Sequence, residues 1–347
     1  DGTSGTVLAV DAGGRPLGRA SLYDEPAPAE PLAAIRAVAP EESLARSSTS
    51  PLARAVALAI PGACILHQAD WLAGRLANRF GWTDENNALK TGYDPVGRLW
   101  PSWIGSVIDP DRLPVVLEPG SAVGRIGAEG VALGLPPSAT VHAGTTDGCA
   151  AFLATGAAEA GEAVTSLGST IVVKLVSDRP IVAPAYGVYS HRIGRLWLAG
   201  GASNAGGAVL ASLFDRDRLA ALGESVDPDR PTGLDYYPLT RAGERFPIDD
   251  PALEPRLSPR PEDERVFFQG VLEGLTKIEA LAYRRLSELG APPLRSVRTV
   301  GGGAANAGWR RLREKALGVP FPPAVSEEAA AGVARLVLAR LTEDGGP

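Results

Sequence analysis

Short runs of β-branched residues alternate with helical patterns along this chain of 347 residues. Strand patterns that end close to a glycine cover 6–11, 140–143, 170–176 and 296–300. The clearest helix is predicted over 264–290, where apolar residues recur at helical spacing and Gly290 provides a stop. Further helices are predicted over 67–81 and 326–341. Strands that alternate with helices predict an α/β fold.

The length of the chain predicts two domains, because single cores stop growing at about 250–300 residues. The most suitable boundary is the small-residue stretch 154–163, "ATGAAEAGEA". We therefore predict an N-terminal domain over 1–158 and a C-terminal domain over 159–347. The proline-rich stretch 227–261 is predicted to be a long surface excursion of the second domain.

Charge and composition argue against several classes of protein. The net charge is -6 and the pI is about 5.3, so the chain has no basic field for nucleic acid. No apolar stretch approaches the roughly 20 residues of a spanning helix and no signal peptide is visible, so we expect no membrane contact and a cytoplasmic location. Two cysteines and three histidines without metal-ligand spacing disfavour a structural zinc site. Nothing marks a dedicated interface, and a homodimer stays open.

The first segment with chemical potential is "TVHAGTTDGCAAFLATG", 140–156. A strand stops at Gly144, a turn of two threonines follows, and a helix begins near Asp147. This pattern places the Asp147 carboxylate at the C-terminal edge of a sheet, where open α/β folds bind ligands. The alternative is that Asp147 only caps the helix. The small, hydroxyl-rich turn favours the approach of a substrate hydroxyl.

Two further segments carry glycine turns. In "SLGSTIVVKL", 166–175, Gly168, Ser169 and Thr170 form a turn whose backbone N–H groups suit a terminal phosphate, although such turns are also common in hairpins. In "TVGGGAANAGWRRLREKALGVP", 299–320, three glycines lie between a strand and a helix that begins near Asn306. This arrangement favours close backbone approach to a ligand and phosphate at the helix N-terminus, or is simply a tight turn. It does not fit G-x-G-x-x-G, so a dinucleotide-dependent oxidoreductase is disfavoured.

The order of these three segments resembles the FGGY family of carbohydrate kinases over essentially the whole chain. The resemblance implies two actin-like, ribonuclease H-like domains with the active site in the cleft between them. It implies that Asp147 is the catalytic base and that Gly168, Ser169 and Thr170 meet the terminal phosphates of ATP. The adenosine-binding turn of the family then falls on Gly301, Gly302, Gly303, Ala304, Asn306 and Trp309.

Within that family, "HQADWLAGRL" and "TDENNALKTGYDP" resemble the D-ribulose kinases and xylulokinase-like proteins more than the glycerol kinases. Asp70 and Lys90 in these stretches are assigned to the substrate. Lys90 belongs to a dense polar cluster whose hydrogen-bonding groups suit a polyol, together with Asp84, Glu85, Asn86 and Asn87. The alternative for this cluster is a solvated loop with a charged rim.

The opening stretch "DGTSGTVLAVD" superficially matches the Asp-x-Gly-Thr-Ser/Thr phosphate turn of the family. The segment "LYDE", 22–25, follows it too soon for that assignment. We therefore predict that this stretch is a wall of the sugar site, with Thr3 and Ser4 facing the substrate. The chain also contains no methionine, not even at position 1. The family's first phosphate turn is accordingly expected upstream, which leaves the first domain incomplete at its start and its metal ligands unknown.

The resemblance implies direct phosphoryl transfer from ATP, with Mg²⁺ as cofactor and a small sugar as partner. Asp147 would take the proton from the primary hydroxyl of a ketopentose, D-ribulose or D-xylulose. The alternative is a catalytically silent sugar- or nucleotide-binding protein on the same scaffold.

Overall fold

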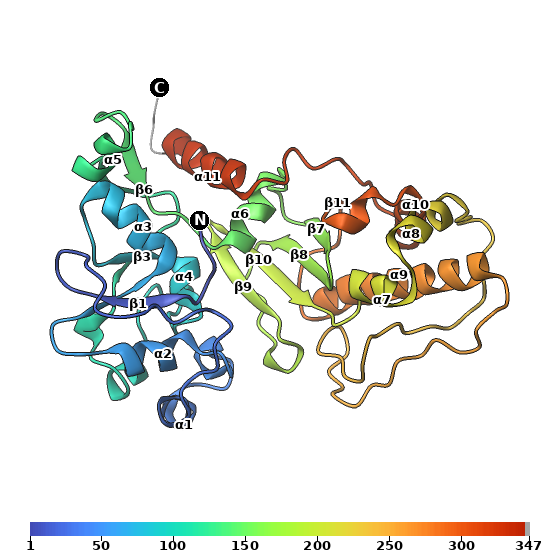
Figure 1. The fold of residues 1–347 in the computed structure, drawn as a ribbon, viewed down its shortest axis with the longest axis horizontal. Helices are drawn as coiled ribbons and strands as arrows, with labels where there is room; N and C mark the ends of the chain where they lie inside the picture. Colours follow the sequence, from blue (N-terminus) through green and yellow to red (C-terminus); the bar gives the residue numbers. More distant parts are fainter. Residues whose placement is uncertain (344–347) are drawn as a thin grey trace. The chain divides into compact units, whose positions relative to one another are not determined.

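The computed structural model describes residues 1–343 and divides them into two compact units. The first unit contains 1–154, the short stretch His191–Arg195 and the C-terminal residues from Glu328. The second unit contains Thr155–Ser190 and Leu196–Glu327. The mixed α/β architecture predicted from the alternating patterns is confirmed (Figure 1).

The first unit is built from three small two-stranded sheets with helices around them. β1 pairs antiparallel with β2, β3 pairs parallel with β4, and β5 pairs antiparallel with β6. Its strands are β1 (Val7–Val10), β2 (Cys64–His67), β3 (Trp82–Asp84), β4 (Val115–Leu117), β5 (Ala122–Arg125) and β6 (Thr140–His142). Its helices are α1 (Ala29–Val38), α2 (Pro51–Leu58), α3 (Gln68–Ala77), α4 (Glu85–Leu89), α5 (Ala128–Ala132), α6 (Asp147–Ala154) and α11 (Ala329–Glu343).

The main apolar core of the first unit lies between the β1–β2 ribbon and the helices α1 and α2. Val7 and Leu52 are fully buried there, as expected for a strand and a helix that turn β-branched and leucine side chains inward. The α2 helix starts sharply because the Ser50 side chain accepts the Ala53 N–H and Pro51 occupies the first turn. Through Val7 and Ala9 of β1, this core anchors the opening segment of the chain.

The second unit is built around one five-stranded sheet in the order β11-β7-β8-β10-β9. β11 pairs parallel with β7, whereas β7 with β8 and β8 with β10 are antiparallel. The strands of this sheet are β7 (Glu162–Leu167), β8 (Ile171–Ser177), β9 (Tyr189–Ile193), β10 (Leu196–Ala202) and β11 (Ser296–Val300). The His191–Ile193 part of β9 groups with the first unit. The helices of the second unit are α7 (Gly207–Leu213), α8 (Arg216–Glu224), α9 (Glu264–Glu288) and α10 (Ala307–Leu317).

The long helix α9 forms the centre of the second core. Phe267, Val271, Leu275 and Ile278 are at most 2% exposed, which confirms the helical periodicity of this stretch. Gly290 adopts a φ of +98° just after the helix, in the left-handed region that glycine tolerates best. The proline-rich stretch 227–261 was predicted to be a surface excursion. It instead packs part of its length into this core, where Tyr236, Leu239 and Phe246 are buried.

The last helix does not belong to the unit in which the predicted domain boundary places it. α11 groups with the first unit and not with the second, because it packs on α6. The two helices approach so closely that a Cβ on Gly332 would clash with the Ala150 carbonyl oxygen. The helix also begins at Ala329, three residues after the predicted start at 326. Among the residues that the structure describes, no helix is both long enough and apolar enough to cross a membrane.

Candidate active site

The turn between β6 and α6 presents Asp147 to solvent. α6 begins at Asp147, and its side chain is exposed. The Asp147 N–H donates to the Gly2 carbonyl at 2.9 Å, and the Gly148 N–H donates to Asp147 Oδ1 at 2.7 Å. The Thr146 hydroxyl accepts the Cys149 N–H at 3.4 Å, which is a capping role. The cap is therefore supplied by Thr146, and the Asp147 carboxylate is accessible to a hydroxyl group.

The opening segment of the chain runs beside this turn. Gly2 forms a parallel bridge with Thr146. Thr3 and Ser4, which come next in the sequence and have half-buried side chains, therefore lie close to Asp147 in space. Lys90, at the end of α4, donates from Nζ to Ser4 Oγ at 2.9 Å. The structure thus brings together four of the residues predicted to bind sugar.

Lys90 places a positive charge next to the exposed carboxylate. Burial lowers the pKa of the Lys90 ammonium, and the negative charge of nearby Asp147 opposes that effect. A partly desolvated ammonium interacts with an acceptor oxygen more strongly than one in water does, because less solvent screens it. This corner of the first unit therefore combines an exposed carboxylate with a hydrogen-bonding cation.

Asp70 occupies a different environment from the other predicted sugar-binding residues. It is 2% exposed, and its Oδ2 accepts the Thr83 hydroxyl at 2.5 Å. His67 Nδ1 lies 2.9 Å from the same hydroxyl, and His67 Nε2 lies 3.0 Å from Thr91 Oγ1. Asp70 thus belongs to a buried network that joins α3 to the segment carrying Lys90, and its role in substrate binding stays a prediction.

The polar cluster at 84–87 is buried, with exposed fractions of 0–2%, so it is not a solvated loop. Asp84 Oδ1 accepts the N–H groups of Asn86 and Asn87 and caps α4. Burial, with a smaller contribution from the charge of Asp70, raises the pKa of Asp84 to about 7. The cluster therefore acts inside the first unit and offers no free surface to a sugar.

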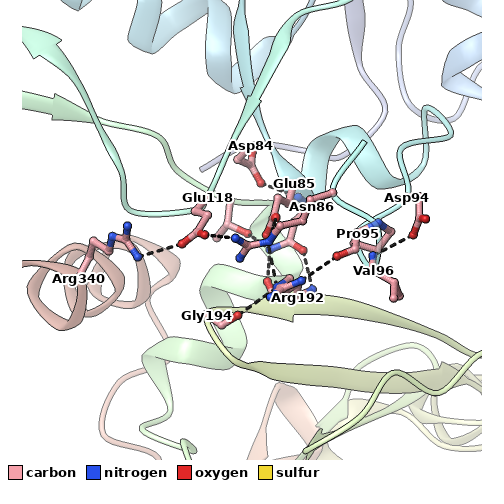
Figure 2. Close-up of polar contacts among 12 residues, drawn as sticks. Asp84, Glu85, Asn86, Asp94, Pro95, Val96, Glu118, Arg192, Gly194 and Arg340 are labelled. Atoms are coloured by element: carbon pink, nitrogen blue, oxygen red, sulfur yellow. Dashed lines mark hydrogen bonds and ion pairs between the residues drawn. The ribbon is translucent and has the colours of Figure 1, made fainter. Parts of the chain in front are cut away.

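Glu85 of this cluster starts a chain of ion pairs (Figure 2). Its Oε1 lies 3.2 Å from Arg98 Nε, and Arg98 also contacts Glu118. Glu118 Oε2 lies 2.9 Å from Arg340 Nη1 on α11. The ion pairs link α4 to the C-terminal helix, which in turn packs on the helix that carries Asp147. None of these partners was expected from the sequence, because they are separated by up to 222 residues.

In the second unit, the turn Gly168–Thr170 joins β7 to β8 and leaves Ser169 exposed. The N–H groups of Gly207 and Ala208 donate to the carbonyls of Gly168 and Ser169 at 2.8 and 3.0 Å. A Cβ on Gly207 would lie 2.6 Å from the Gly168 oxygen, so the start of α7 must be glycine to pack here. Sequence reasoning missed this partner. The repeated glycines of "GGASNAGG", 200–207, are the signal that could have indicated it.

The second glycine turn lies beside the first. Gly301 has a φ of +86°, and a Cβ there would lie 3.0 Å from the carbonyl oxygen of Leu167, directly before Gly168. Gly302–Ala305 form a short 3-10 turn, and Asn306 caps α10 by accepting the Trp309 N–H at 2.9 Å. Ala304 is half-buried in the same turn. Because β7 and β11 are parallel neighbours, both predicted nucleotide-binding turns fall at one edge of the sheet.

Trp309 lies beneath the turn and not on its surface. It is 1% exposed, and its Nε1 donates to Thr276 Oγ1 of α9 at 3.1 Å. A small cavity of about 70 Å³ lies nearby, lined by residues that include Thr299, Ala304 and Arg313. The indole therefore supports the turn through the core, and its assignment to nucleotide binding stays a prediction.

A buried ion pair connects the strands that lead into the two turns. Arg313 donates to the Glu279 carboxylate through Nε and Nη2 at 2.6 and 2.7 Å, and both side chains are at most 1% exposed. Glu279 also accepts the hydroxyl of Thr165 on β7, and Arg313 donates to Thr299 on β11. These contacts tie α9 and α10 to the ends of both strands.

Within residues 1–343, no group of three or more His, Cys, Asp or Glu side chains could hold a metal ion. We therefore assign no magnesium ligand in the described part of the chain.

Comparison with known proteins identifies the family to which the second half of the chain is similar. The model of the FGGY family of carbohydrate kinases, C-terminal domain, matches residues 163–340. Gluconokinase from Bacillus subtilis (strain 168) is 23% identical over 203 residues, which are 52% of this chain and 39% of that protein. The chain thus spans less than half the length of this curated relative.

Solved structures show the same fold. A xylulose kinase from Rhodospirillum rubrum gives a TM-score of 0.81 at 21% identity, covering 97% of this chain and 73% of that chain. Plasmodium falciparum glycerol kinase with ADP gives 0.81 at 16% identity, covering 98% of this chain and 74% of that one. The chain therefore has the actin-like fold of these kinases. It belongs to the FGGY family of carbohydrate kinases.

Proposed function

We propose that this protein is an ATP-dependent sugar kinase that phosphorylates the primary hydroxyl of a ketopentose, D-ribulose or D-xylulose, with Asp147 as general base. The observation that carries the proposal is the exposed Asp147 carboxylate beside Lys90 and the opening segment, in a chain of the FGGY family. The structural relatives include xylulose, gluconate and glycerol kinases, so family membership supports a sugar or polyol acceptor. The choice of a ketopentose rests on the motifs at 67–76 and 83–95.

In the first unit, the sugar is bound by Thr3, Ser4 and Lys90. Hydroxyl groups of threonine and serine donate and accept hydrogen bonds, which suits a polyol. The Lys90 ammonium has three donors and is already directed at Ser4 Oγ, so it can bridge that hydroxyl and a sugar oxygen. Asp70 is the remaining residue predicted to bind the sugar, and its buried carboxylate accepts the Thr83 hydroxyl.

Asp147 removes the proton from the attacking hydroxyl. One oxygen of its carboxylate is oriented by the Gly148 N–H, and the exposed side chain can reach a substrate hydroxyl. A carboxylate held in hydrogen-bond reach of the reacting proton typically contributes 10²–10⁴-fold as a general base. The hydroxyl oxygen forms the new bond to the γ-phosphorus, the bond to the ADP oxygen breaks, and Asp147 holds the proton.

In the second unit, the two glycine turns bind ATP. Gly168, Ser169 and Thr170 offer backbone N–H groups and hydroxyls to the terminal phosphates. The turn at Gly301–Asn306 allows the backbone to approach the adenosine closely, because it carries three successive glycines. Mg²⁺ is the expected cofactor of the family reaction, and the transfer itself depends mostly on positioning and electrostatics.

The proposal is tested by sugar-dependent ADP release. The purified protein is given ATP and Mg²⁺ with D-ribulose, D-xylulose, D-gluconate or glycerol, and ADP is measured in a coupled assay. The account predicts turnover with at least one ketopentose at a higher kcat/KM than with glycerol or gluconate. Turnover confined to gluconate or glycerol would overturn the ketopentose assignment. Binding of sugar and ATP without ADP release would favour a silent binding protein.

A further inference from the structure

The side-chain amide of Asn86 is hydrogen-bonded through both its nitrogen and its oxygen. Asn86 lies on α4 and is 1% exposed. Nδ2 donates to Thr145 Oγ1 and to the Arg192 carbonyl, each at 3.0 Å, while the Arg192 N–H donates to Oδ1 at 3.0 Å (Figure 2). Both N–H bonds and the carbonyl are therefore satisfied, and only one orientation of the amide fits.

These contacts reach the turn that carries the proposed base. Thr145 is 1% exposed and stands two residues before Asp147. The other side of the turn is held by Gly2, whose carbonyl accepts the Asp147 N–H. The turn is thus fixed between the opening segment on one side and Asn86 on the other.

Arg192 fixes Asn86 in return. The residues His191–Arg195 belong to the first unit although they form the end of β9 and the turn that leads into β10. Arg192 donates from Nη1 to the Pro95 carbonyl at 2.9 Å, and its Nε lies 4.0 Å from Glu85 Oε2 (Figure 2). Asn86 is therefore held by a rigid set of neighbours, as a side chain that positions another residue must be.

We propose that Asn86 is the positioning residue of the catalytic turn, holding Thr145, and through it Asp147, in the geometry needed for proton removal. It cannot contact the sugar, because its side chain is buried and fully hydrogen-bonded. Aspartate at this position would set an acceptor oxygen against the Arg192 carbonyl, and alanine would leave the Thr145 hydroxyl and the Arg192 backbone without this partner. This inference rests on the proposed function of Asp147.

The neighbouring Asn87 provides a matched control. It lies on the same helix and is equally buried at 1%, but its Nδ2 donates to Asp84 and not to the turn. Replacing either asparagine by alanine removes a buried amide and destabilises the first unit. Only Asn86→Ala removes the support of Thr145, so only this variant should change the geometry of Asp147.

The experiment compares Asn86→Ala, Asn87→Ala and the milder Thr145→Val in the full chain. With D-ribulose or D-xylulose and ATP, Asn86→Ala should lower kcat by about 10- to 100-fold at unchanged KM for ATP, as expected for a reacting group displaced by about 1 Å. Asn87→Ala should keep kcat within about twofold of the wild type. Thr145→Val should lower kcat in the same direction, and the double variant Asn86→Ala/Thr145→Val should be no slower than Asn86→Ala.

A second readout does not depend on turnover. Hydrogen exchange of the backbone amides at 146–149 should become faster in Asn86→Ala than in Asn87→Ala. Equal kcat values in the two alanine variants, or equal exchange at these amides, would overturn the inference. A wild-type protein without turnover on either ketose would instead count against the proposed function, and the exchange measurement would still decide the role of Asn86.

Discussion

The ion pair between Glu279 and Arg313 provides a prediction with a magnitude that follows from its surroundings. Glu279 is 0% exposed and Arg313 is 1% exposed. The substitution Arg313→Met removes two charged donors from the Glu279 carboxylate and leaves it the Thr165 hydroxyl at 2.5 Å. Removing one partner of a buried pair typically costs about 3–5 kcal/mol, because the other charge stays buried and uncompensated.

The double variant Glu279→Leu/Arg313→Met should recover much of that loss. It removes both charges, and Thr165 keeps a hydroxyl partner in Tyr283 at 2.7 Å. Replacing a whole buried pair by apolar side chains of similar volume is often neutral. The control is Lys315→Met on the same helix, which breaks an exposed pair with Asp229 and should leave stability nearly unchanged.

Guanidinium unfolding followed by tryptophan fluorescence measures these differences, and hydrogen exchange of the α9 amides assigns the transition to the second unit. A loss of about 3–5 kcal/mol is a large part of the 5–15 kcal/mol that stabilises a typical domain. The same Arg313→Met variant should raise the KM for ATP, because the pair ties together both strands that lead into the glycine turns. A double variant that loses as much stability as the two single changes added together would refute the reasoning.

Three further predictions concern single positions. Burial raises the pKa of Asp84 to about 7, so its contribution to stability declines as pH rises from about 4 to 7. The stability advantage of Asp84→Asn over the wild type, measured by urea midpoints, should therefore increase between pH 5 and pH 8. The new amide can donate to Asn87 Oδ1, which is buried without a partner in 1–343. A pH-independent difference would contradict this. Gly302→Ala should weaken ATP binding in calorimetry at an unchanged melting temperature, since a Cβ there meets nothing within 4 Å of the protein; unchanged affinity would exclude close contact of the nucleotide. Lys90→Met should raise the KM for the sugar while the affinity for ATP stays the same, and a selective loss of ATP affinity would place Lys90 elsewhere.

Several elements of the fold could be predicted from the sequence because their signals are local. β11 occupies Ser296–Val300 as predicted, and α9 ends just before Gly290, because β-branched runs, helical periodicity and a left-handed glycine each act over a few residues. The return of α11 to the first unit could not be predicted. It depends on the close approach of Gly332 to α6 across about half the chain.

In the candidate site, too, local features could be predicted and contacts between distant segments could not. The predicted residues around Asp147 and in the two glycine turns come together within their own units, because the turns follow predictable strands. The burial of Asp70 and Trp309 was not visible in the sequence, because burial is set by segments that are distant along the chain. Gly207 and the pair of Glu279 with Arg313 were likewise missed as partners of the site, and Asn86 was assigned to a polyol-binding cluster and not to the Asp147 turn. Each acts through contacts separated by 34 to 114 residues.

The most direct test of the central claim compares the wild type with Asp147→Asn in sugar-dependent ADP release, with binding of ATP measured in parallel. The side chain of Asp147 is exposed, so asparagine should leave the fold and much of the nucleotide affinity intact. The account predicts ADP release that requires a ketopentose in the wild type and is abolished in Asp147→Asn. Near-native turnover of Asp147→Asn would contradict the assignment of Asp147 as the catalytic base.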